Sequence, residues 1–217
     1  IELGNDWQKK FKSFEKKSCS AASLGQVHKA KSVDGENLAC KLQYPDMQSA
    51  IEADLKQLKL AFNLYERADK AISTKSIHKE LSARLAEELD YKREASNLKL
   101  YSAILKSEKS VFVPDVIDNL STDRLLTMTW LEGNKLVDWL EKKPILKSRH
   151  NVAVNMFKAW YVPFYFYGVI HGDPHLGNYS ITNKDEINLL DFGSVRFFNP
   201  TFVEGVITLY TALKTNN

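Results

Sequence analysis

Alternating apolar and polar positions predict a pair of strands near the start of the chain. Residues 26–31 alternate as a half-buried strand does, and residues 37–43 (NLACKLQ) form a second run that ends at Tyr44-Pro45. Asp34-Gly35 lies between the two runs and is a strong signal for a tight hairpin turn. The small residues 18–25 (SCSAASLG) precede this hairpin and are expected to form a flexible loop.

Further along the chain, apolar residues recur at helical spacing. They fall three and four apart from Met47 to Lys109, and a second, largely apolar helical region extends from Leu136 to Tyr167. Residues 111–118 and 124–130, between these regions, resemble strands. A short strand pair around residues 183–186 and a final helix over 202–213 complete the expected elements.

The order of these elements predicts an α+β molecule with two lobes. The charged residues 1–17 are expected to form a short helix or linker. A break at Glu132-Gly133 then separates a small strand-bearing N-lobe, 18–132, from a mainly helical C-lobe, 133–217. Ligands commonly occupy clefts between lobes. The chain starts without Met and stops after a helix-like run, so truncation at both ends is expected.

Composition excludes several classes of protein. Thirty basic and 27 acidic residues leave a net charge of +3, and no compact Lys/Arg run indicates binding of nucleic acid. Cys19 and Cys40 have neither metal-binding spacing nor a disulfide framework, which favours a reducing, intracellular compartment. The most apolar stretch, residues 159–170, has about twelve residues, whereas a membrane-spanning helix needs about twenty. A buried helix is therefore expected there.

The segment from Val169 to Asn178 (VIHGDPHLGN) carries the clearest chemistry. Asp173 and Asn178 are five residues apart on a loop that contains Pro174 and Gly177, and Asp191-Phe192-Gly193 follows thirteen residues after Asn178. Phosphoryl transfer needs a carboxylate that orients the acceptor, together with oxygen ligands that hold Mg²⁺ on the phosphates. In kinase-like sites an Asp, an Asn five residues later and the Asp of a DFG sequence fill these roles. The spacing therefore predicts a phosphoryl-transfer centre of Asp173, Asn178 and Asp191.

The two histidines of this segment also allow a zinc site to be considered. His171 and His175 are four apart, but Gly172 and Pro174 indicate a loop rather than the helix of an HExxH site. His171 is instead expected to brace the loop by hydrogen bonding.

A kinase-like site also needs a strand lysine that reaches the phosphates. Ala39-Cys40-Lys41 fits, because a small residue could cover an adenine and Lys41 lies two positions later on the same strand face. Its acidic partner should lie on the helical stretch that follows. The residues alone leave four candidates open: Glu87, Glu88, Asp90 and Glu94.

Together these residues resemble the UbiB family of atypical kinase-like ATPases, which are tied to ubiquinone biosynthesis. The resemblance covers nearly the whole chain. Residues 20–30 (SAASLGQVHKA) are similar to the family's Ala-rich nucleotide loop followed by GQVH, where ordinary protein kinases have a Gly-rich loop. Residues 88–97 (ELDYKREASN) are similar to the family's ExD segment and the EAxN run after it.

The resemblance implies a two-lobed protein-kinase-like fold and a set of residue roles. It makes Glu94 the partner of Lys41, and Glu88 with Asp90 the ExD pair. Nucleotide-binding positions are then expected in the Ala-rich loop, on the two strands and at the lobe connection: Ala21, Ala22, Ser23, Val27, Ala39, Lys41, Met128 and Leu131. Alanines restrict a backbone that glycines would leave free to wrap phosphates, so the loop should bind ATP differently.

Three departures from the family pattern are visible. The family's KxGQ segment is not part of these residues, and the catalytic loop usually reads HADPHPGN, so Gly172 and Leu176 are substitutions. Cys40 stands where Val is common. Gly172 and Leu176 are at conformational positions and remove no expected ligand, and a small buried apolar site should tolerate Cys40.

The leading hypothesis is an ATP- and Mg²⁺-dependent atypical kinase or ATPase that supports isoprenoid-quinone biosynthesis. The resemblance also implies a lipid or quinone-pathway intermediate and a membrane-bound biosynthetic complex as partners. It implies a peripheral location at the bacterial inner membrane or in mitochondria. Two alternatives remain open at this point: a small-molecule phosphotransferase, which the catalytic loop alone would allow, and a catalytically slow pseudokinase scaffold.

Overall fold

The computed structural model describes residues 2–68 and 74–215, which form two compact units. The first unit contains residues 1–93 and 117–128, and the second contains residues 94–116 and 129–217. The sequence-based division at Glu132-Gly133 remains a prediction.

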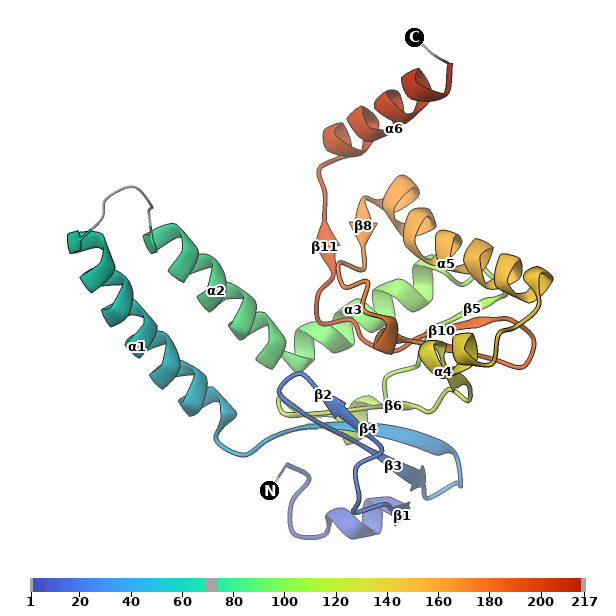
Figure 1. Ribbon diagram of the computed structural model, residues 1–217. Helices are drawn as coiled ribbons and strands as arrows, with labels where there is room; N and C mark the ends of the chain where they lie inside the picture. Colours follow the sequence, from blue (N-terminus) through green and yellow to red (C-terminus); the bar gives the residue numbers. More distant parts are fainter. Residues whose placement is uncertain (1, 69–73, 216–217) are drawn as a thin grey trace. The chain divides into compact units, whose positions relative to one another are not determined.

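A five-stranded sheet forms the centre of the first unit (Figure 1). Its order is β1-β3-β4-β6, with β2 paired to β3. The strands are β1 (Phe11–Phe14), β2 (Ser20–Ala22), β3 (Gly25–Ser32), β4 (Asn37–Gln43) and β6 (Leu125–Thr129). Strands β3 and β4 pair in antiparallel register from Gly25↔Gln43 to Lys31↔Asn37, so the predicted hairpin is confirmed.

Residues 2–22 differ from the expectation. A 3-10 turn, η1 (Trp7–Lys10), precedes β1, which pairs with β3 through an irregularity between Phe11 and Ser13. Edge-to-face contacts join the rings of Trp7, Phe11 and Phe14. The prediction of a charged helix or linker over 1–17 was therefore wrong, because apolar contacts hold this segment on the sheet. The prediction of a flexible loop was likewise wrong for β2, which pairs with β3 from Ser20↔Val27 to Ala22↔Gly25.

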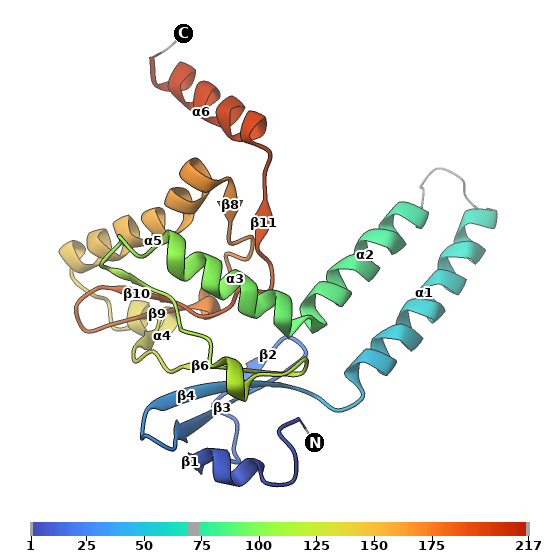
Figure 2. The ribbon, with the colours of Figure 1, turned by 180° about the vertical axis from the view of Figure 1, so that it is seen from behind.

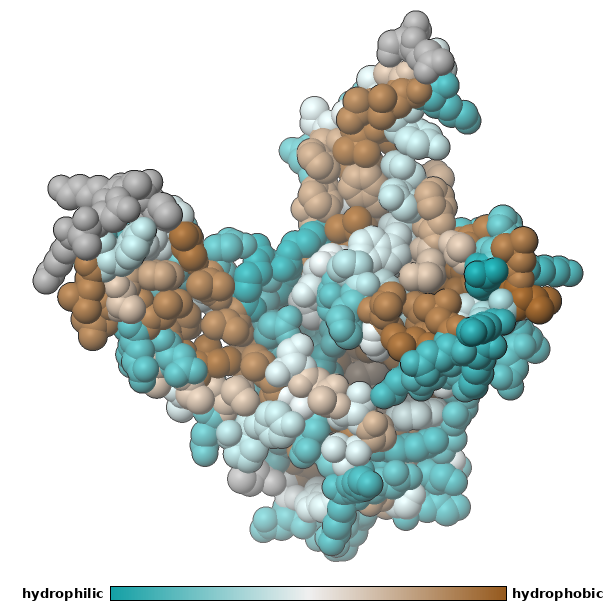
Figure 3. Space-filling model, in the orientation of Figure 1, coloured by the Kyte–Doolittle hydropathy of each residue, from teal (hydrophilic) through white to brown (hydrophobic). Residues whose placement is uncertain are grey.

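The predicted helical region after Met47 is confirmed as three helices: α1 (Met47–Ala68), α2 (Thr74–Leu89) and α3 (Tyr91–Ile104). Helices α1 and α2 lie side by side, and the His78 ring hydrogen-bonds the Leu55 carbonyl across them at 2.9 Å (Figures 1 and 2). Hydrophobic residues, brown in Figure 3, follow both helices. Large side chains that are exposed on these helices are Leu60, Leu64, Tyr65, Ile77 and Leu81. The apolar residues predicted at helical spacing therefore lie on helices, but part of the apolar face of α1 and α2 is exposed.

The second unit has a four-stranded sheet in the order β5-β10-β9-β7 and a two-stranded sheet, β11-β8. Their bounds are β5 (Val111–Phe112), β7 (Asn134–Lys135), β8 (Val169–Ile170), β9 (Tyr179–Ile181), β10 (Ile187–Leu189) and β11 (Arg196–Phe197). Strands β9 and β10 are the strand pair predicted around residues 183–186, which is confirmed. The strand predicted over 111–118 is shorter than expected, because only β5 forms there and η2 (Asp118–Leu120) follows.

Three helices complete the second unit: α4 (Leu136–Glu141), α5 (Leu146–Tyr167) and α6 (Pro200–Thr215). Helix α5 contacts β5, β8 and β10 (Figure 2). Within the apolar stretch from residue 159, Ala159 and Phe164 are buried, but Phe166 and Tyr167 are 77% and 59% exposed. The helix predicted there exists, but burial covers only one of its faces. Among the described residues, no helix combines the length and the hydropathy needed to cross a membrane.

The two cysteines differ in environment, which gives a first testable prediction. Cys40 is fully buried beside Leu38 in the core of the first unit, and burial raises the pKa of its thiol to about 11. Cys19 is exposed. Because the thiolate is the reactive form, we expect Ellman's reagent to titrate one thiol rapidly in the native protein and the second only in guanidinium. Rapid native reaction of both thiols would contradict this placement, and Cys19→Ser should abolish the fast phase.

Candidate active site

The loop between β8 and β9 brings Asp173 and Asn178 into direct contact. Asn178 lies in a 3-10 turn, η3 (Leu176–Asn178), and its Nδ2 donates to Asp173 Oδ2 at 2.6 Å. Asp173 Oδ1 accepts the His175 N–H at 3.1 Å, and the His175 ring caps η3 by accepting the Gly177 N–H at 3.1 Å. Hydrogen bonds of the Asp173, His175 and Asn178 side chains therefore hold residues 173–178 in one compact loop.

Asp191 follows β10 and is joined to this loop through the backbone. The Leu190 N–H donates to the Asn178 carbonyl at 3.0 Å, directly after the antiparallel pairing of β9 with β10. The Asp191 carboxylate accepts the Gly193 N–H at 3.0 Å. Asn178 comes directly before β9, and Asp191 comes two residues after the end of β10. Because the strands are antiparallel, both residues lie at the same end of the strand pair.

His171 connects the two segments from within the core. Its ring is 1% exposed, its Nδ1 lies 3.1 Å from the Asp173 carbonyl, and its Nε2 hydrogen-bonds the Asp191 carbonyl. The rings of four neighbours surround it: Tyr101, Trp160, Tyr179 and Phe192. This burial lowers the pKa of His171, so the ring is neutral at neutral pH and carries a single N–H. We assign that N–H to Nε2, because the Asp191 carbonyl is the closer acceptor.

Gly172 allows the catalytic loop to pass close to the segment after Asp191. Its φ is +78°, in the left-handed region that favours glycine. A Cβ built at this position would collide with the Ser194 carbonyl oxygen and lie 3.2 Å from its carbon. The residue that departs from the family pattern is therefore required here by both conformation and space.

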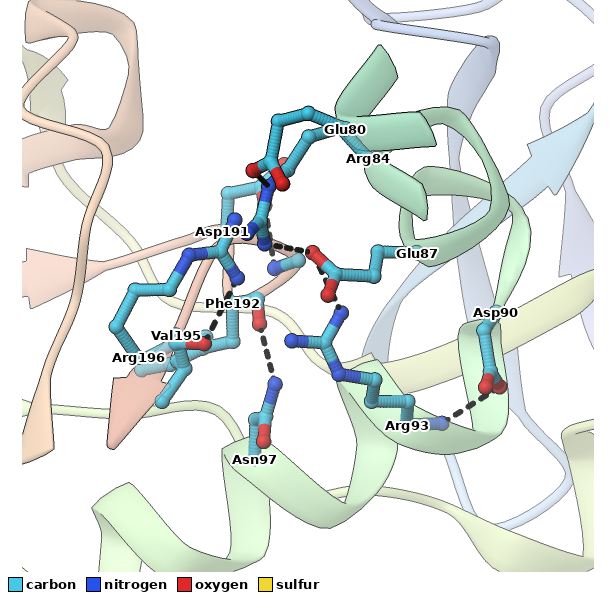
Figure 4. A network of polar contacts seen from close by, with 11 residues as sticks. Glu80, Arg84, Glu87, Asp90, Arg93, Asn97, Asp191, Phe192, Val195 and Arg196 are labelled. Carbon is cyan, nitrogen blue, oxygen red and sulfur yellow. Dashed lines mark hydrogen bonds and ion pairs between the residues drawn. The ribbon is translucent and has the colours of Figure 1, made fainter. Parts of the chain in front are cut away.

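Helix α3 supplies two polar contacts to Phe192, of which Figure 4 shows the one from Asn97. Asn97 Nδ2 donates to the Phe192 carbonyl at 2.9 Å, and the Phe192 N–H donates to Glu94 Oε1 at 3.4 Å. Asn97 was not among the candidate site residues. Asn97 is the last residue of the EAxN run, and that run is the signal that could have found it.

The predicted nucleotide-binding positions of the first unit share one sheet face. In the β3–β4 register Val27 lies opposite Lys41 and Lys29 opposite Ala39, so Val27, Ala39 and Lys41 face the same side. Lys41 is 8% exposed, and its Nζ lies 5.3 Å from the centre of the Tyr91 ring. Ala21, Ala22 and Ser23 form the end of the β2–β3 hairpin. Met128 is buried in β6, whereas Leu131 belongs to the second unit.

The predicted partner of Lys41 belongs to the other unit, so this pairing remains a prediction. Lys41 is part of the first unit, and Glu94, which is 3% exposed, is part of the second. The same holds for any arrangement of Lys41 with Asp173 or Asp191.

The ExD positions have different local environments. Asp90 Oδ1 accepts the Arg93 N–H at 2.9 Å and so caps the first turn of α3 (Figure 4). Glu88 is half-buried in the last turn of α2. Its neighbour Glu87 pairs with Arg84 at 2.7 Å and with Arg93 at 3.2 Å. Both ion pairs therefore involve Glu87, which was one of the four residues considered as the partner of Lys41.

The comparisons with known proteins give a single answer on the family. The ABC1 atypical kinase-like domain matches residues 1–217. The chain belongs to the ABC1 atypical kinase-like family. The resemblance to UbiB proteins is thereby confirmed, as is the expected kinase-like fold with strands towards its start and helices towards its end.

Individual members of the ABC1 family are similar over most of the chain. The mitochondrial atypical kinase coq-8 of Caenorhabditis elegans is 31% identical over 93% of the chain, and the mitochondrial atypical kinase COQ8 of Saccharomyces cerevisiae is 30% identical over 93%. The chain spans only 27% and 40% of the length of these relatives. A solved structure of Rv3197 with erythromycin, from Mycobacterium tuberculosis, has a TM-score of 0.81 and 28% identity, covering 90% of this chain and 49% of that one.

The polar side chains of this ABC1 domain include oxygen donors that fit magnesium. Among the described residues, no group of three or more His, Cys, Asp and Glu side chains is placed to hold a metal ion. Asn178 uses its amide nitrogen on Asp173, which leaves the amide oxygen as the atom for a cation. One amide oxygen and the Asp191 carboxylate match the few oxygen ligands that Mg²⁺ usually takes from a protein.

Proposed function

We propose that this ABC1 domain binds ATP with Mg²⁺ and transfers the γ-phosphoryl group, as an ATPase of the UbiB type. The observation that carries the proposal is the bonded set in which Asn178 donates to the Asp173 carboxylate, the Leu190 N–H donates to the Asn178 carbonyl, and His171 donates to the Asp191 carbonyl. Chance occurrence of an Asp, an Asn and a DFG sequence would not require them to meet in one place.

Each residue has a stated role in the proposal. Asn178 and Asp191 hold Mg²⁺, which, when bound, neutralises charge on the phosphates. Asp173 orients the attacking water or acceptor hydroxyl and receives its proton. Lys41 binds the phosphates with Glu94 as its partner, and Val27 and Ala39 line the adenine pocket. His171 holds the Asp191 carbonyl by a hydrogen bond, and its buried ring lies next to the Asp173 carbonyl.

The biological setting is also a proposal. Relatives named as mitochondrial atypical kinases of the COQ8 type support a role in isoprenoid-quinone biosynthesis. On this view the protein acts peripherally at the bacterial inner membrane or in mitochondria. Its partners there are a lipid or quinone-pathway intermediate and a membrane-bound biosynthetic complex.

The role of Asp173 can be tested by substitution with Asn. Asp173→Asn retains the size of the side chain but removes the base, so we expect ATP turnover to fall by about 100- to 10,000-fold. ATP should still raise the melting temperature, because Asp173 is not among the groups proposed to bind the nucleotide. Release of phosphate and thermal shift with ATP, with and without Mg²⁺, measure the two effects.

A matched control is Asp138→Asn, which changes an exposed carboxylate in the first turn of α4. It should leave turnover unchanged. Turnover that Asp173→Asn does not alter would favour the pseudokinase scaffold, and phosphate that accumulates on an added alcohol would favour the small-molecule phosphotransferase. Absence of any ATP-dependent thermal shift would refute the proposal itself.

A further inference from the structure

Three residues on one face of α3 contact Phe192. Glu94, Asn97 and Tyr101 follow one another at spacings of three and four, and they are 3%, 5% and 0% exposed. Phe192 is itself 0% exposed. Three consecutive side chains on one helix face are therefore buried against the residue that follows the proposed magnesium ligand Asp191.

The contacts divide between the backbone and the ring of Phe192. Its N–H is bound by Glu94 at 3.4 Å, its carbonyl by Asn97 at 2.9 Å, and its ring packs against the Tyr101 ring with 5.1 Å between centroids (Figure 4 shows the Asn97 bond). The Asn97 bond has ideal length for an amide donor, whereas the Glu94 bond is near the upper limit. Asn97 therefore provides the stronger polar anchor.

The anchored carbonyl lies between two other backbone groups that are held by hydrogen bonds. Gly193 follows Phe192, and the carboxylate of Asp191 bonds the Gly193 N–H. On the other side, the Asp191 carbonyl is held by His171. The carbonyls of residues 191 and 192 belong to the two peptide groups on either side of Phe192. Hydrogen bonds to both carbonyls limit the rotation of these peptide groups.

We propose that Asn97 is a positioning residue that sets the Asp191 carboxylate for the metal by holding the Phe192 carbonyl. The proposal rests on the proposed function in one respect, namely that Asp191 binds Mg²⁺. Asn97 touches neither metal nor nucleotide in this scheme and acts through the backbone of Phe192. Residues that orient a metal ligand in this way typically change metal affinity by about 10- to 100-fold when they are lost.

The decisive variant is Asn97→Leu, which retains the branched shape but removes the donor without adding charge. With ATP saturating, we expect the Mg²⁺ concentration for half-maximal turnover to rise by about 10-fold or more. Thermal stabilisation by ATP without metal should stay the same. Asn97→Ala serves as a second variant if the leucine side chain prevents folding.

Asn155→Leu is the matched control. Asn155 also donates its Nδ2 to a backbone carbonyl at 2.9 Å, that of Asp185, in the same unit but outside the proposed site. Its loss should lower the melting temperature without changing the Mg²⁺ requirement. If the Asn97 variants lower stability in the same way and leave the Mg²⁺ requirement unchanged, the positioning role is refuted.

Hydrogen exchange separates the failure of this inference from the failure of the proposed function. Without nucleotide or metal, amides of residues 191–195 should exchange faster in Asn97→Leu than in the wild type and be unaffected in Asn155→Leu. If the wild type shows no response to Mg²⁺ and ATP, the proposed function fails. Hydrogen exchange still tests whether Asn97 holds the Phe192 backbone, and faster exchange in Asn97→Leu supports this role. Unchanged exchange in both Asn97 variants overturns it.

Discussion

Asp191→Asn should abolish the magnesium-dependent part of nucleotide stabilisation while leaving the fold intact. The Asp191 carboxylate accepts the Gly193 N–H at 3.0 Å, and an amide oxygen can accept the same bond. The charge, however, is lost, and with it the only ionised ligand that we propose for the metal. Since the loss of a residue that merely orients a ligand costs about 10- to 100-fold in metal affinity, removal of the ligand charge should cost more than that.

The measurement is the melting temperature with ATP, in the presence of Mg²⁺ and in the presence of EDTA. The wild type should show an additional increase with Mg²⁺, because binding to the native state alone stabilises it. Asp191→Asn should show the same melting temperature in both conditions, and Asp138→Asn should behave as the wild type. A full Mg²⁺-dependent increase in Asp191→Asn would remove Asp191 from the metal site.

Gly172→Ala should have the second large effect, although alanine is the usual residue of the family at this position. The φ of +78° and the approach of the Ser194 carbonyl leave no room for a Cβ. Holding a non-glycine residue in such a conformation costs about 1–3 kcal/mol, and the collision adds to this unless the loop moves. We expect the free energy of unfolding to fall by at least about 1 kcal/mol. Turnover should fall as well, because movement of the loop displaces Asp173.

Gly205→Ala provides the matched control for this prediction. Gly205 lies inside α6, and a Cβ there would meet no atom within 4 Å. Alanine in a helix interior should stabilise the protein by about 0.5–1 kcal/mol relative to glycine. Urea unfolding of both variants measures the contrast. Equal, small effects of the two substitutions would show that residue 172 does not require its left-handed conformation.

The sequence predicted the β3–β4 hairpin but not strands β1 and β2. Asp34-Gly35 between two alternating runs gave the β3–β4 hairpin, and with it the shared face of Val27, Ala39 and Lys41. Strand β1 escaped prediction because the irregularity between Phe11 and Ser13 breaks the two-residue period. Strand β2 consists of small residues with weak strand preference, and it forms because β3 offers it a partner.

In the candidate site, contacts within one loop were likewise predictable, whereas contacts between distant segments were not. The five-residue spacing of Asp173 and Asn178 predicted their association, since one short loop contains both. The Asn97 bond to Phe192 joins residues 95 positions apart, and no spacing along the chain specifies such a contact. The collision at Gly172 also depends on a distant backbone oxygen, so the sequence showed the substitution without its reason.

The close approach of Gly172 to the Ser194 carbonyl constrains how this loop can change during evolution. A chain with alanine at position 172 would need a different backbone path at one of the two positions. Alanine fits here only after the segment around Ser194 has shifted, so the order in which substitutions arise decides which of them are tolerated. Positions 172 and 194 should therefore vary together among relatives, and a catalytic loop transplanted without its partner segment should fail.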